Sequence, residues 1–417
     1  RNQLFDLNVS PSQTSIDVKK FNAVTNFGEP DVIRSVQLLP GISATNETSA
    51  GLNIRGGSPQ QNLVLFDNFT VYQLDHFFGI FSAFNSNVIK DVQLYKSAYA
   101  APWGTRVSGV MDITSKSGNR EKVSGSVGVN LFSANAVLEL PIGKKTSVLL
   151  AGRRAYTDVI QSDLYKKVIG QRVEGQSSLA STSGLDSEVI DNDFYFYDVN
   201  AKVTHRFDDQ NQLHFSCYSG KDDLTQSGRE ANIFGSDLKL EEASDWGNRG
   251  MSLSYGRQWN DRFYTNLSVS QSSYFKNLTN REFERDTLNV DINGYEFTYE
   301  YNNEIEELNI NLNAELKIND RHQLNFGLYN FNSSVNYANL YTYQFMDFEP
   351  ESDSDLGFSD EAIVSGLYFQ HLFTPGGKTR IKSGLRATTY SLSDQIFLAP
   401  RFSVSHLITD QLMLKLA

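Results

Sequence analysis

The sequence has little cysteine, little proline and no long apolar run, and each shortage excludes a class of protein. Cys217 is the only cysteine among 417 residues, which excludes an intramolecular disulfide framework and a cysteine-rich zinc site. No apolar run reaches the ~18 residues that a transmembrane helix needs. The sequence contains 37 Lys and Arg residues and 49 Asp and Glu residues, and the resulting net charge of −12 argues against a nucleic-acid-binding surface.

The N-terminal part of the chain mixes helix and strand signals. Pro30 suits the first turn of a short helix, and one face of that helix carries Val32, Ile33 and Val36. Apolar runs on both sides of Asp67-Asn68 predict a tight hairpin. Two further strands are predicted over 92–94 and 110–113. We therefore predict a small α/β domain over residues 1–118.

From Lys122 onward the pattern changes to strict alternation of apolar and polar residues. In one segment, Leu308, Ile310 and Leu312 alternate with asparagine and glutamate. About 13 such segments follow one another, most of them close to the ~9–11 residues with which a tilted strand crosses a bilayer. The pattern predicts an antiparallel transmembrane β-barrel over 119–417, which makes the chain mainly β.

The connections between these segments support the barrel over a soluble β-sandwich. Short turns such as Gly143-Lys144 and Asn319-Asp320 alternate with long polar connections, which we place at 157–195, 220–248, 273–305 and 332–361. Transmembrane barrels sort their loops in this way, with short periplasmic turns and long outer loops. A sandwich also alternates apolar and polar residues, but it rarely sorts its loops by length.

The two ends of the sequence suggest that it is part of a longer protein. Arg1 is neither an initiator methionine nor the start of a signal peptide, so we expect a processed or trimmed chain whose location the missing signal does not reveal. The last segment stops at Ala417 in mid-alternation. Because bacterial barrels have an even number of strands, we expect the barrel to continue.

Short motifs in the N-terminal part resemble the plug domain of TonB-dependent receptors, in particular the large group found in Bacteroidota. They occur in the family's order and spacing, at Asp31–Arg34, Leu38–Gly41, Asn53–Gly57, Gln61–Asp67, Gly104–Arg106 and Val110–Thr114. The barrel segment resembles the family in pattern only. Such receptors have about 22 strands around a plugged lumen, so residues 119–417 are expected to be the N-terminal part of the barrel.

The resemblance implies a function and a location. A receptor of this family imports a scarce nutrient, such as a metal chelate, cofactor, glycan or peptide, across the bacterial outer membrane when periplasmic TonB pulls on a box before the plug. The sequence from Arg1 to Ser15 contains no convincing box. The alternative is a receptor-like barrel without transport that serves as a subunit of an outer-membrane assembly or secretion complex. TonB is the expected partner, and a surface-exposed lipoprotein, other envelope proteins and lipopolysaccharide are further candidates.

The resemblance also implies roles for individual plug residues. Arg55 and Arg106 match positions at which plug arginines meet barrel carboxylates. A confined guanidinium needs a carboxylate partner or many waters, so an arginine in a hydrated crevice is the alternative. Gly56 and Gly57 are expected to adopt backbone conformations that other residues avoid, and Asp67 completes the plug motif.

Candidate ligand contacts lie in the plug and in the predicted loop 332–361. His76 is a candidate in the plug, and a packed loop histidine is the alternative. Tyr337, Tyr341 and Tyr343 form either an interfacial aromatic girdle or a grip on a sugar or other ligand. The same loop is acidic, and it is either solvated or binds a divalent cation shared with lipopolysaccharide. The weak candidates for that site are Asp353 and Asp355.

The remaining reactive side chains do not form the arrangement of an enzyme. The sequence contains neither a Gly-x-Ser-x-Gly elbow nor a His-Glu-x-x-His motif. Cys217 is expected to be a small lipid-facing residue. Four other histidines fall on apolar faces near strand ends, where interfacial placement is expected: His205, His322, His371 and His406. We therefore expect no catalytic residue and no cofactor.

Overall fold

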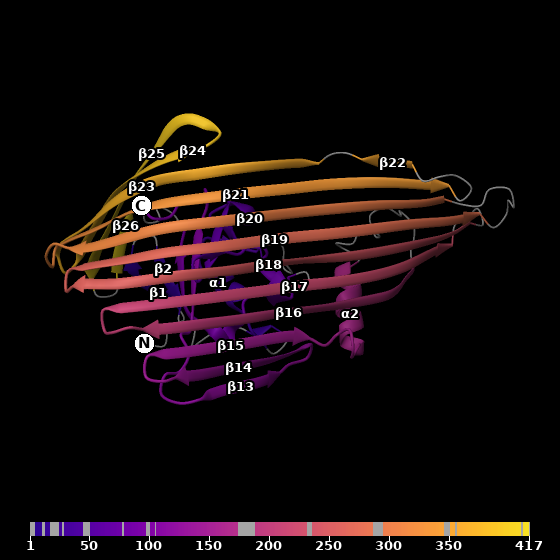
Figure 1. The fold of residues 1–417 in the computed structure, drawn as a ribbon, viewed down its shortest axis with the longest axis horizontal. Coiled ribbons are helices and arrows are strands. Elements are labelled where there is room, and N and C mark those ends of the chain that lie inside the picture. Colours follow the sequence, from indigo (N-terminus) through magenta and orange to yellow (C-terminus); the bar gives the residue numbers. More distant parts are fainter. Residues whose placement is uncertain are drawn as a thin grey trace.

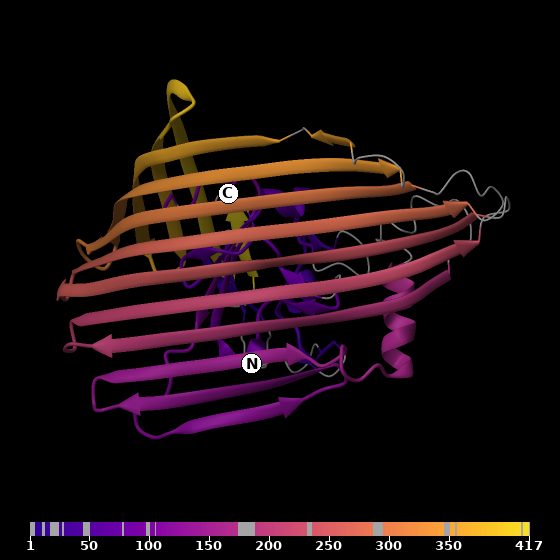
Figure 2. The same ribbon diagram turned by 45° about the vertical axis from the view of Figure 1, so that its right-hand side comes forward.

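The computed structural model describes most of the chain. The described ranges are 5–10, 13–16, 25–26, 29–44, 51–76, 79–96, 101–104, 106–173, 188–231, 236–286, 295–345, 351–354, 357–409 and 412–416. Among these residues, no helix is long and apolar enough to span a membrane. The structure has two parts, an N-terminal plug and a large curved sheet, which is called the wall below (Figures 1 and 2).

The plug is built on a six-stranded sheet with the order β1-β2-β11-β12-β7-β8. β12 and β7 are parallel, and the other neighbours are antiparallel. In chain order the six strands are β1 (Phe5–Ser10), β2 (Gln13–Ile16), β7 (Leu63–Phe66), β8 (Phe69–Thr70), β11 (Ile89–Tyr95) and β12 (Val110–Ser115). The strands predicted near 92–94 and 110–113 are therefore confirmed.

The described part of the plug also contains three small hairpins, one helix and two 3-10 turns. The hairpins pair β3 (Thr25–Asn26) with β4 (Glu29–Pro30), β5 (Ile42–Ser43) with β6 (Asn53–Ile54), and β9 (Asp75–His76) with β10 (Phe81–Ser82). The turns η2 (Pro59–Gln61) and η3 (Ser86–Val88) each span three residues.

The predicted plug helix is α1 (Val32–Gln37). Its N-cap is Asp31, whose carboxylate accepts a hydrogen bond from the backbone N–H of Arg34 at 2.9 Å. Pro30 belongs to β4, so its predicted place in the first turn is wrong. The capping carboxylate of Asp31 places the first helical residue at Val32. The predicted apolar face is confirmed, because Val32, Ile33 and Val36 are all buried.

The hairpin predicted at Asp67-Asn68 is also confirmed. β7 and β8 are antiparallel and pair Phe66 with Phe69. The φ angles of Asp67 and Asn68 are 44° and 76°, which is the left-handed conformation that a two-residue type I′ turn requires at both positions. Asp and Asn tolerate this conformation better than other non-glycine residues.

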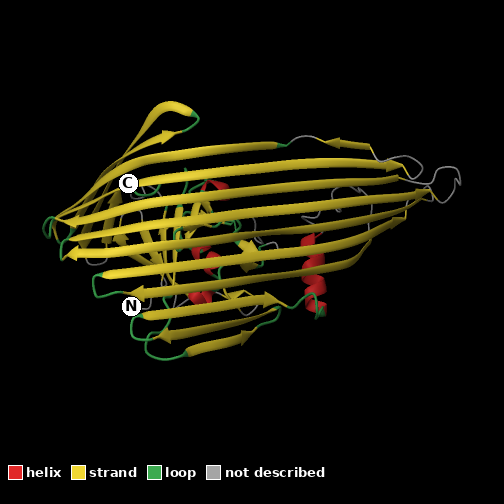
Figure 3. Cartoon of the chain, in the orientation of Figure 1, coloured by secondary structure: helices red, strands yellow, loops and turns green. Residues whose placement is uncertain are grey.

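The wall is one antiparallel sheet in which each strand neighbours the next in the sequence, from β13 to β26 (Figure 3). Only the short β22 lies off this path, paired with β21. The strands are β13 (Ser124–Val129), β14 (Ser133–Ile142), β15 (Thr146–Ala155), β16 (Glu188–Arg206), β17 (Asn211–Ala231), β18 (Ser236–Asn260), β19 (Phe263–Asp286), β20 (Tyr295–Lys317), β21 (His322–Phe345), β22 (Glu351–Ser354), β23 (Phe358–Gly376), β24 (Thr379–Tyr390), β25 (Ser393–Thr409) and β26 (Leu412–Leu416). The helix α2 (Asp163–Val173) lies between β15 and β16. The mainly β fold predicted from the sequence is confirmed.

The prediction of long polar loops is wrong for most of the residues concerned. β18 has 25 residues and β19 has 24, so the segments 220–248 and 273–305 are mainly strand. Neither face of these parts is regularly aliphatic, so the search for apolar alternation missed them. Their backbone groups nevertheless continue the ladder without interruption, as in β19 and β20 from Phe263 to Glu284.

The two faces of the wall differ in what they contact. The inner face packs on the plug: Ser272 of β19 and Glu307 of β20 are buried there and bind plug residues. The outer face carries the alternating apolar side chains, including Leu308 and Ile310, which are 44% and 41% exposed. Side-chain direction alternates along a strand, so odd-numbered residues of β20 and β21 share the inner face.

Candidate functional site between the plug and the wall

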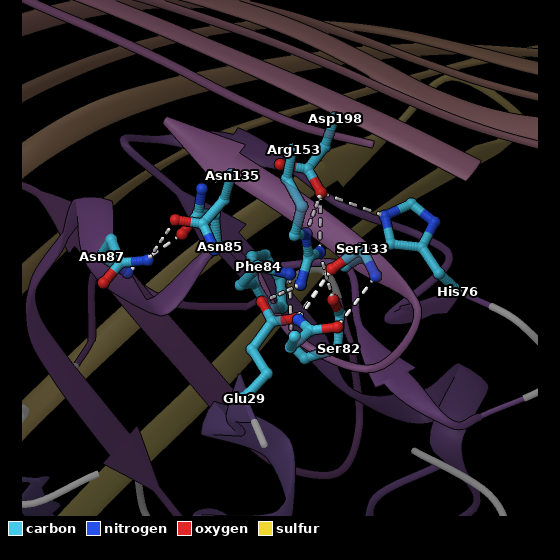
Figure 4. A network of polar contacts seen from close by, with 12 residues as sticks. Glu29, His76, Ser82, Phe84, Asn85, Asn87, Ser133, Asn135, Arg153 and Asp198 are labelled. Carbon is cyan, nitrogen blue, oxygen red and sulfur yellow. Dashed lines mark hydrogen bonds and ion pairs between the residues drawn. The ribbon is translucent and has the colours of Figure 1, made fainter. Parts of the chain in front are cut away.

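A buried arginine of the wall joins two segments of the plug. Arg153 on β15 donates to Glu29 of the plug at 2.5 Å and binds Asp198 of β16 at 2.6 Å. Its guanidinium also donates to the backbone carbonyl of Ser82 at 2.7 Å. Figure 4 shows Arg153 between the two carboxylates. Because the Arg153 side chain is 1% exposed, its charge needs these partners to remain buried.

His76 extends this network to a third wall strand. Its Nδ1 lies 2.6 Å from a carboxylate oxygen of Asp222 on β17, and its Nε2 lies 3.6 Å from Asp198. The ring stacks on Phe196 with centroids 4.5 Å apart. Burial lowers the pKa of His76, but the charge of Asp222, the hydrogen bond to it and the nearby carboxylate of Asp198 outweigh burial and raise the pKa from 6.5 to about 9. His76 is therefore a cation at neutral pH.

The turn residue Asp67 forms a second ionic contact with the wall. Lys202 of β16 donates to Asp67 at 2.8 Å, and the Ser216 hydroxyl of β17 donates to it at 2.7 Å. Ser115 of the plug binds the same carboxylate through its backbone N–H at 3.0 Å. Burial raises the pKa of Asp67, but Lys202 and the hydrogen bonds outweigh burial and lower the pKa below its usual value. Asp67 thus occupies the turn of the hairpin and also forms an ionic contact with the wall.

Glu307 of β20 holds the segment that follows this turn. The hydroxyl of Thr70 donates to Glu307 at 2.6 Å, and the hydroxyl of Tyr72 donates to its other oxygen. The backbone N–H of Thr70 donates to Ser272 at 2.8 Å. Asn248 of β18 accepts from the backbone N–H groups of residues 72 and 73 and donates to the carbonyl of residue 73 at 2.9 Å. The plug strand is therefore fixed to three successive wall strands.

Two cavities lie on either side of the contact between Thr70 and Glu307. The larger, of about 730 Å³, is lined by Tyr72 and Arg106 of the plug and by Tyr274 and Ile305 of the wall. The smaller, of about 250 Å³, lies toward the short turns and has an amide-rich lining that includes Asn309, Asn311, Asn313 and Asn325. Thr70 lines both cavities. The contact thus forms a septum between them, which we call the Glu307 septum.

A further contact ties the end of the plug to a distant part of the wall. Arg386 of β24 donates to the carbonyl of Pro102 at 2.7 Å, and its guanidinium lies 3.4 Å from the centre of the Tyr329 ring. Gln370 of β23 accepts from the backbone N–H of Ala101 at 3.0 Å. Because Asn135 of β14 also accepts from Asn87 of the plug at 3.2 Å, the contacts between plug and wall extend from β14 to β24.

The arginines predicted from the resemblance lie at the surface of the plug. Arg55 is exposed and has a φ of 50°. Arg106 lines the larger cavity and interacts with the hydroxyl of Tyr72. Contacts of either arginine with wall carboxylates remain predictions. Gly56 has a φ of 82°, as predicted, whereas the prediction of a special backbone conformation is wrong for Gly57, whose φ is not positive. Gly57 is instead required by space, because a Cβ there would collide with the side chain of Ser108.

The aromatic candidates lie on the inner face. Tyr337, Tyr341 and Tyr343 are odd-numbered residues of β21, as is Tyr329, which contacts Arg386 on the inner face. Alternate residues of a strand share a face, so all of them lie on the inner face. Their ligand contacts remain a prediction, as does a ligand contact of His76. The side chain of Asp353 and all of Asp355 lie outside the described residues. Within the described part of the chain, no group of three or more His, Cys, Asp or Glu residues is arranged to hold a metal ion.

Several residues of the network were missed at the level of the sequence: Glu29, Arg153, Asp198, Lys202, Asp222 and Glu307. A signal for some of them exists. Asp198 and Lys202 stand four residues apart in one alternating strand, so they share its polar face. A charge of each sign on the inner face of a barrel strand indicates partners across the interface, although it does not identify them.

Comparisons with known proteins agree with this geometry. Residues 8–110 match the family model of the TonB-dependent Receptor Plug Domain. The chain has the plug and the fold of a TonB-dependent receptor. A search among curated proteins gives no match. The assignment to the Bacteroidota type remains a prediction.

Solved structures of such receptors are similar in fold and distant in sequence. A mutant of the ferric enterobactin receptor PfeA from Pseudomonas aeruginosa superposes with a TM-score of 0.60 at 13% identity, over 98% of this chain and 61% of that one. The ferric-catecholate import receptor Fiu from Escherichia coli gives 0.55 at 10% identity, over 97% and 73%. The RagAB peptide importer gives 0.60 at 10% identity, over 95% and 57%. The chain thus spans about three fifths of the length of PfeA.

Replacement of Arg153 is expected to weaken the attachment of the plug. Arg153→Ala leaves Glu29 and Asp198 buried without their cation, which costs roughly 3–5 kcal/mol for a broken buried pair. Urea unfolding of the protein in detergent measures the change. Arg154→Ala is the matched control, because its side chain is 49% exposed in an ion pair with Asp158 and is expected to change stability by less than about 1 kcal/mol. Equal midpoints for both variants would contradict the assigned role.

The His76 contact predicts a pH dependence with a definite sign. The pKa of His76 rises from 6.5 to about 9 on folding, so its stabilisation is fully present below pH 6.5 and is lost as the pH rises through 9. His76→Gln removes this term. The difference in free energy of unfolding between the parent protein and His76→Gln should shrink from about pH 6 to about pH 10. A difference that stays constant across this range would show that His76 is neutral in the folded protein.

Proposed function

We propose that the protein is an outer-membrane receptor that imports a scarce nutrient under TonB control. The observation that carries this proposal is a plug fixed to the inner face of a barrel wall by polar and ionic contacts, while the outer face is apolar. The wall exposes Leu367, Leu385 and Leu414 at 54%, 46% and 63%. A band of this kind is stable in lipid and prone to aggregation in water.

The order of the contacts along the chain suggests how the plug is released. β1 is the edge strand of the plug sheet and the first in the sequence. A force applied to the chain before β1 therefore acts on an edge and can separate β1 and β2 from β11 one hydrogen bond at a time. Further along the chain, Glu29 binds Arg153 of the wall. Among the described residues, this is the next contact between plug and wall. Loss of that pair would expose buried charges to water and favour further opening.

The same geometry suggests where a ligand passes. Both cavities have lining residues on β19 and β20, and Thr70 of the Glu307 septum lines both of them. A plug displacement that separates Thr70 and Tyr72 from Glu307 would join the cavities into one path. The lining of the smaller cavity includes asparagine amides beside the charged Glu315 and Arg386, and the amides can exchange hydrogen bonds with a passing polar ligand.

The test of import is accumulation of ligand in cells that produce the whole protein, with and without TonB. Import predicts that uptake of the bound nutrient stops when TonB is removed. The alternative, a barrel subunit of an outer-membrane assembly without transport, predicts stable co-purification with other envelope proteins and equal uptake in both strains. A surface-exposed lipoprotein in the same purification would support its role as a second partner.

Removal of the septum carboxylate is expected to open the path. Glu307→Ala eliminates the acceptor of Thr70 and Tyr72, and it leaves a gap between the cavities. Cells that produce this variant should become more permeable to a large antibiotic, which measures leakage independently of TonB. Glu306→Ala is the matched control, because Glu306 immediately precedes Glu307 and lies exposed on the outer face. Equal sensitivity of the two strains would show that Glu307 does not close the path.

A further inference from the structure

The upper part of the inner face carries a row of aromatic side chains. Three ring pairs cross from β20 to β21. Tyr301 and Tyr337 have centroids 5.4 Å apart, Tyr299 and Tyr341 5.0 Å apart, and Phe297 and Tyr343 4.8 Å apart. Successive residues on one face of a strand stand roughly 6.6 Å apart, so the pairs form a ladder along the wall, which we call the aromatic track.

Amide side chains hold the rings of this track. Asn339 accepts a hydrogen bond from the Tyr299 hydroxyl at 3.3 Å and donates to the Tyr337 hydroxyl at 2.8 Å. Asn303 donates to the Tyr301 hydroxyl at 3.3 Å. Rings fixed in this way lose little conformational entropy when a ligand binds, and that lowers the cost of binding.

The position of the track excludes the role of a membrane girdle. A girdle lies on the lipid-facing side of a barrel, whereas these rings stand on the inner face. Tyr343 is nevertheless 49% exposed. The track also leads to the larger cavity, because the next inner residues below Tyr301 are Asn303 and Ile305, and Ile305 lines that cavity together with Tyr72 and Tyr274.

The near absence of charged residues along the track restricts the class of ligand that it can bind. The inner positions of β20 from Tyr295 to Ile305, and of β21 from Val335 to Tyr343, contain no charged residue. The cation of Lys276 lies 5.9 Å from the Tyr301 ring at the lower end. Glu282 borders the upper end, where it accepts from Tyr295 at 2.9 Å. An anionic metal chelate needs several cations in its site, and one lysine does not supply them.

We infer that the aromatic track binds a neutral oligosaccharide. This inference rests on the proposed import and names its substrate class. The C–H faces of a sugar ring are apolar and can pack on the Tyr and Phe rings, while its hydroxyls can bind the amides of Asn303 and Asn339 and the tyrosine hydroxyls. Repeated ring pairs on a straight strand fit a ligand of repeated units, which can move from one pair to the next toward the larger cavity.

The test measures binding to the whole protein in detergent by calorimetry. The probes are maltohexaose, mannohexaose and xylohexaose, with ferric enterobactin as an anionic chelate and tetra-alanine as a peptide. We expect at least one neutral sugar to bind, and Tyr301→Ala and Tyr341→Ala to weaken it about tenfold each. The variants Tyr301→Phe and Tyr341→Phe keep the ring and are expected to keep most of the affinity. Tyr197→Ala is the control, because Tyr197 lies on the opposite face of the wall.

The possible results separate this inference from the proposed import. Binding of ferric enterobactin or the peptide with no binding of any sugar overturns the track as a sugar site, and so does sugar binding that is unchanged in both alanine variants. Neither result affects TonB-dependent uptake, which is measured separately in cells. Conversely, sugar binding that depends on the tyrosines, together with uptake that is independent of TonB, supports the track and overturns import.

Discussion

The arrangement of the two parts depends on one buried charge. Arg153 belongs to the wall, yet one of its two carboxylate partners belongs to the plug, so the guanidinium is satisfied only when the parts are together. Separation of the two parts would break the pair between Arg153 and Glu29 and expose both charges to water. His76 adds to this dependence, since its own charge is maintained by Asp198 and Asp222 of the wall. Such an interface is specific in position, because a shifted plug would lose its ion pairs.

Polar attachment suits the plug movement that the proposed import requires. A continuous apolar interface would separate only at the cost of exposing its whole area to water. Carboxylate, amide and hydroxyl groups can exchange partners with water one at a time. The interface does contain apolar packing, as Val137, Leu149 and Tyr218 of the wall join the core of the plug. They lie on β14, β15 and β17, close to the densest ionic contacts, whereas both cavities have lining residues on β19 and β20.

The sequence predicted those features that follow from short-range patterns. The left-handed pair Asp67-Asn68 predicted the hairpin, and alternation at period two predicted the wall and its outer face. The upper strands escaped prediction because neither face of a segment such as 273–286 is regularly aliphatic, and their stability comes from cross-strand pairing. The ionic network escaped because its members are distant in the chain. Arg153 and Glu29 are 124 residues apart, and His76 and Asp222 are 146 apart.

The length of the strands determines how far the sheet extends beyond the membrane. A strand of 25 residues, such as β18, measures roughly 80 Å along its axis at about 3.3 Å per residue. With a tilt of about 40° it rises roughly 60 Å, whereas the apolar band of such a barrel is about 25 Å tall. In the proposed outer-membrane location, the sheet would therefore extend well beyond the lipid head groups. Solutes would first meet the upper ends of these paired strands. The hydrogen bonds between the strands fix the distance of this contact from the membrane.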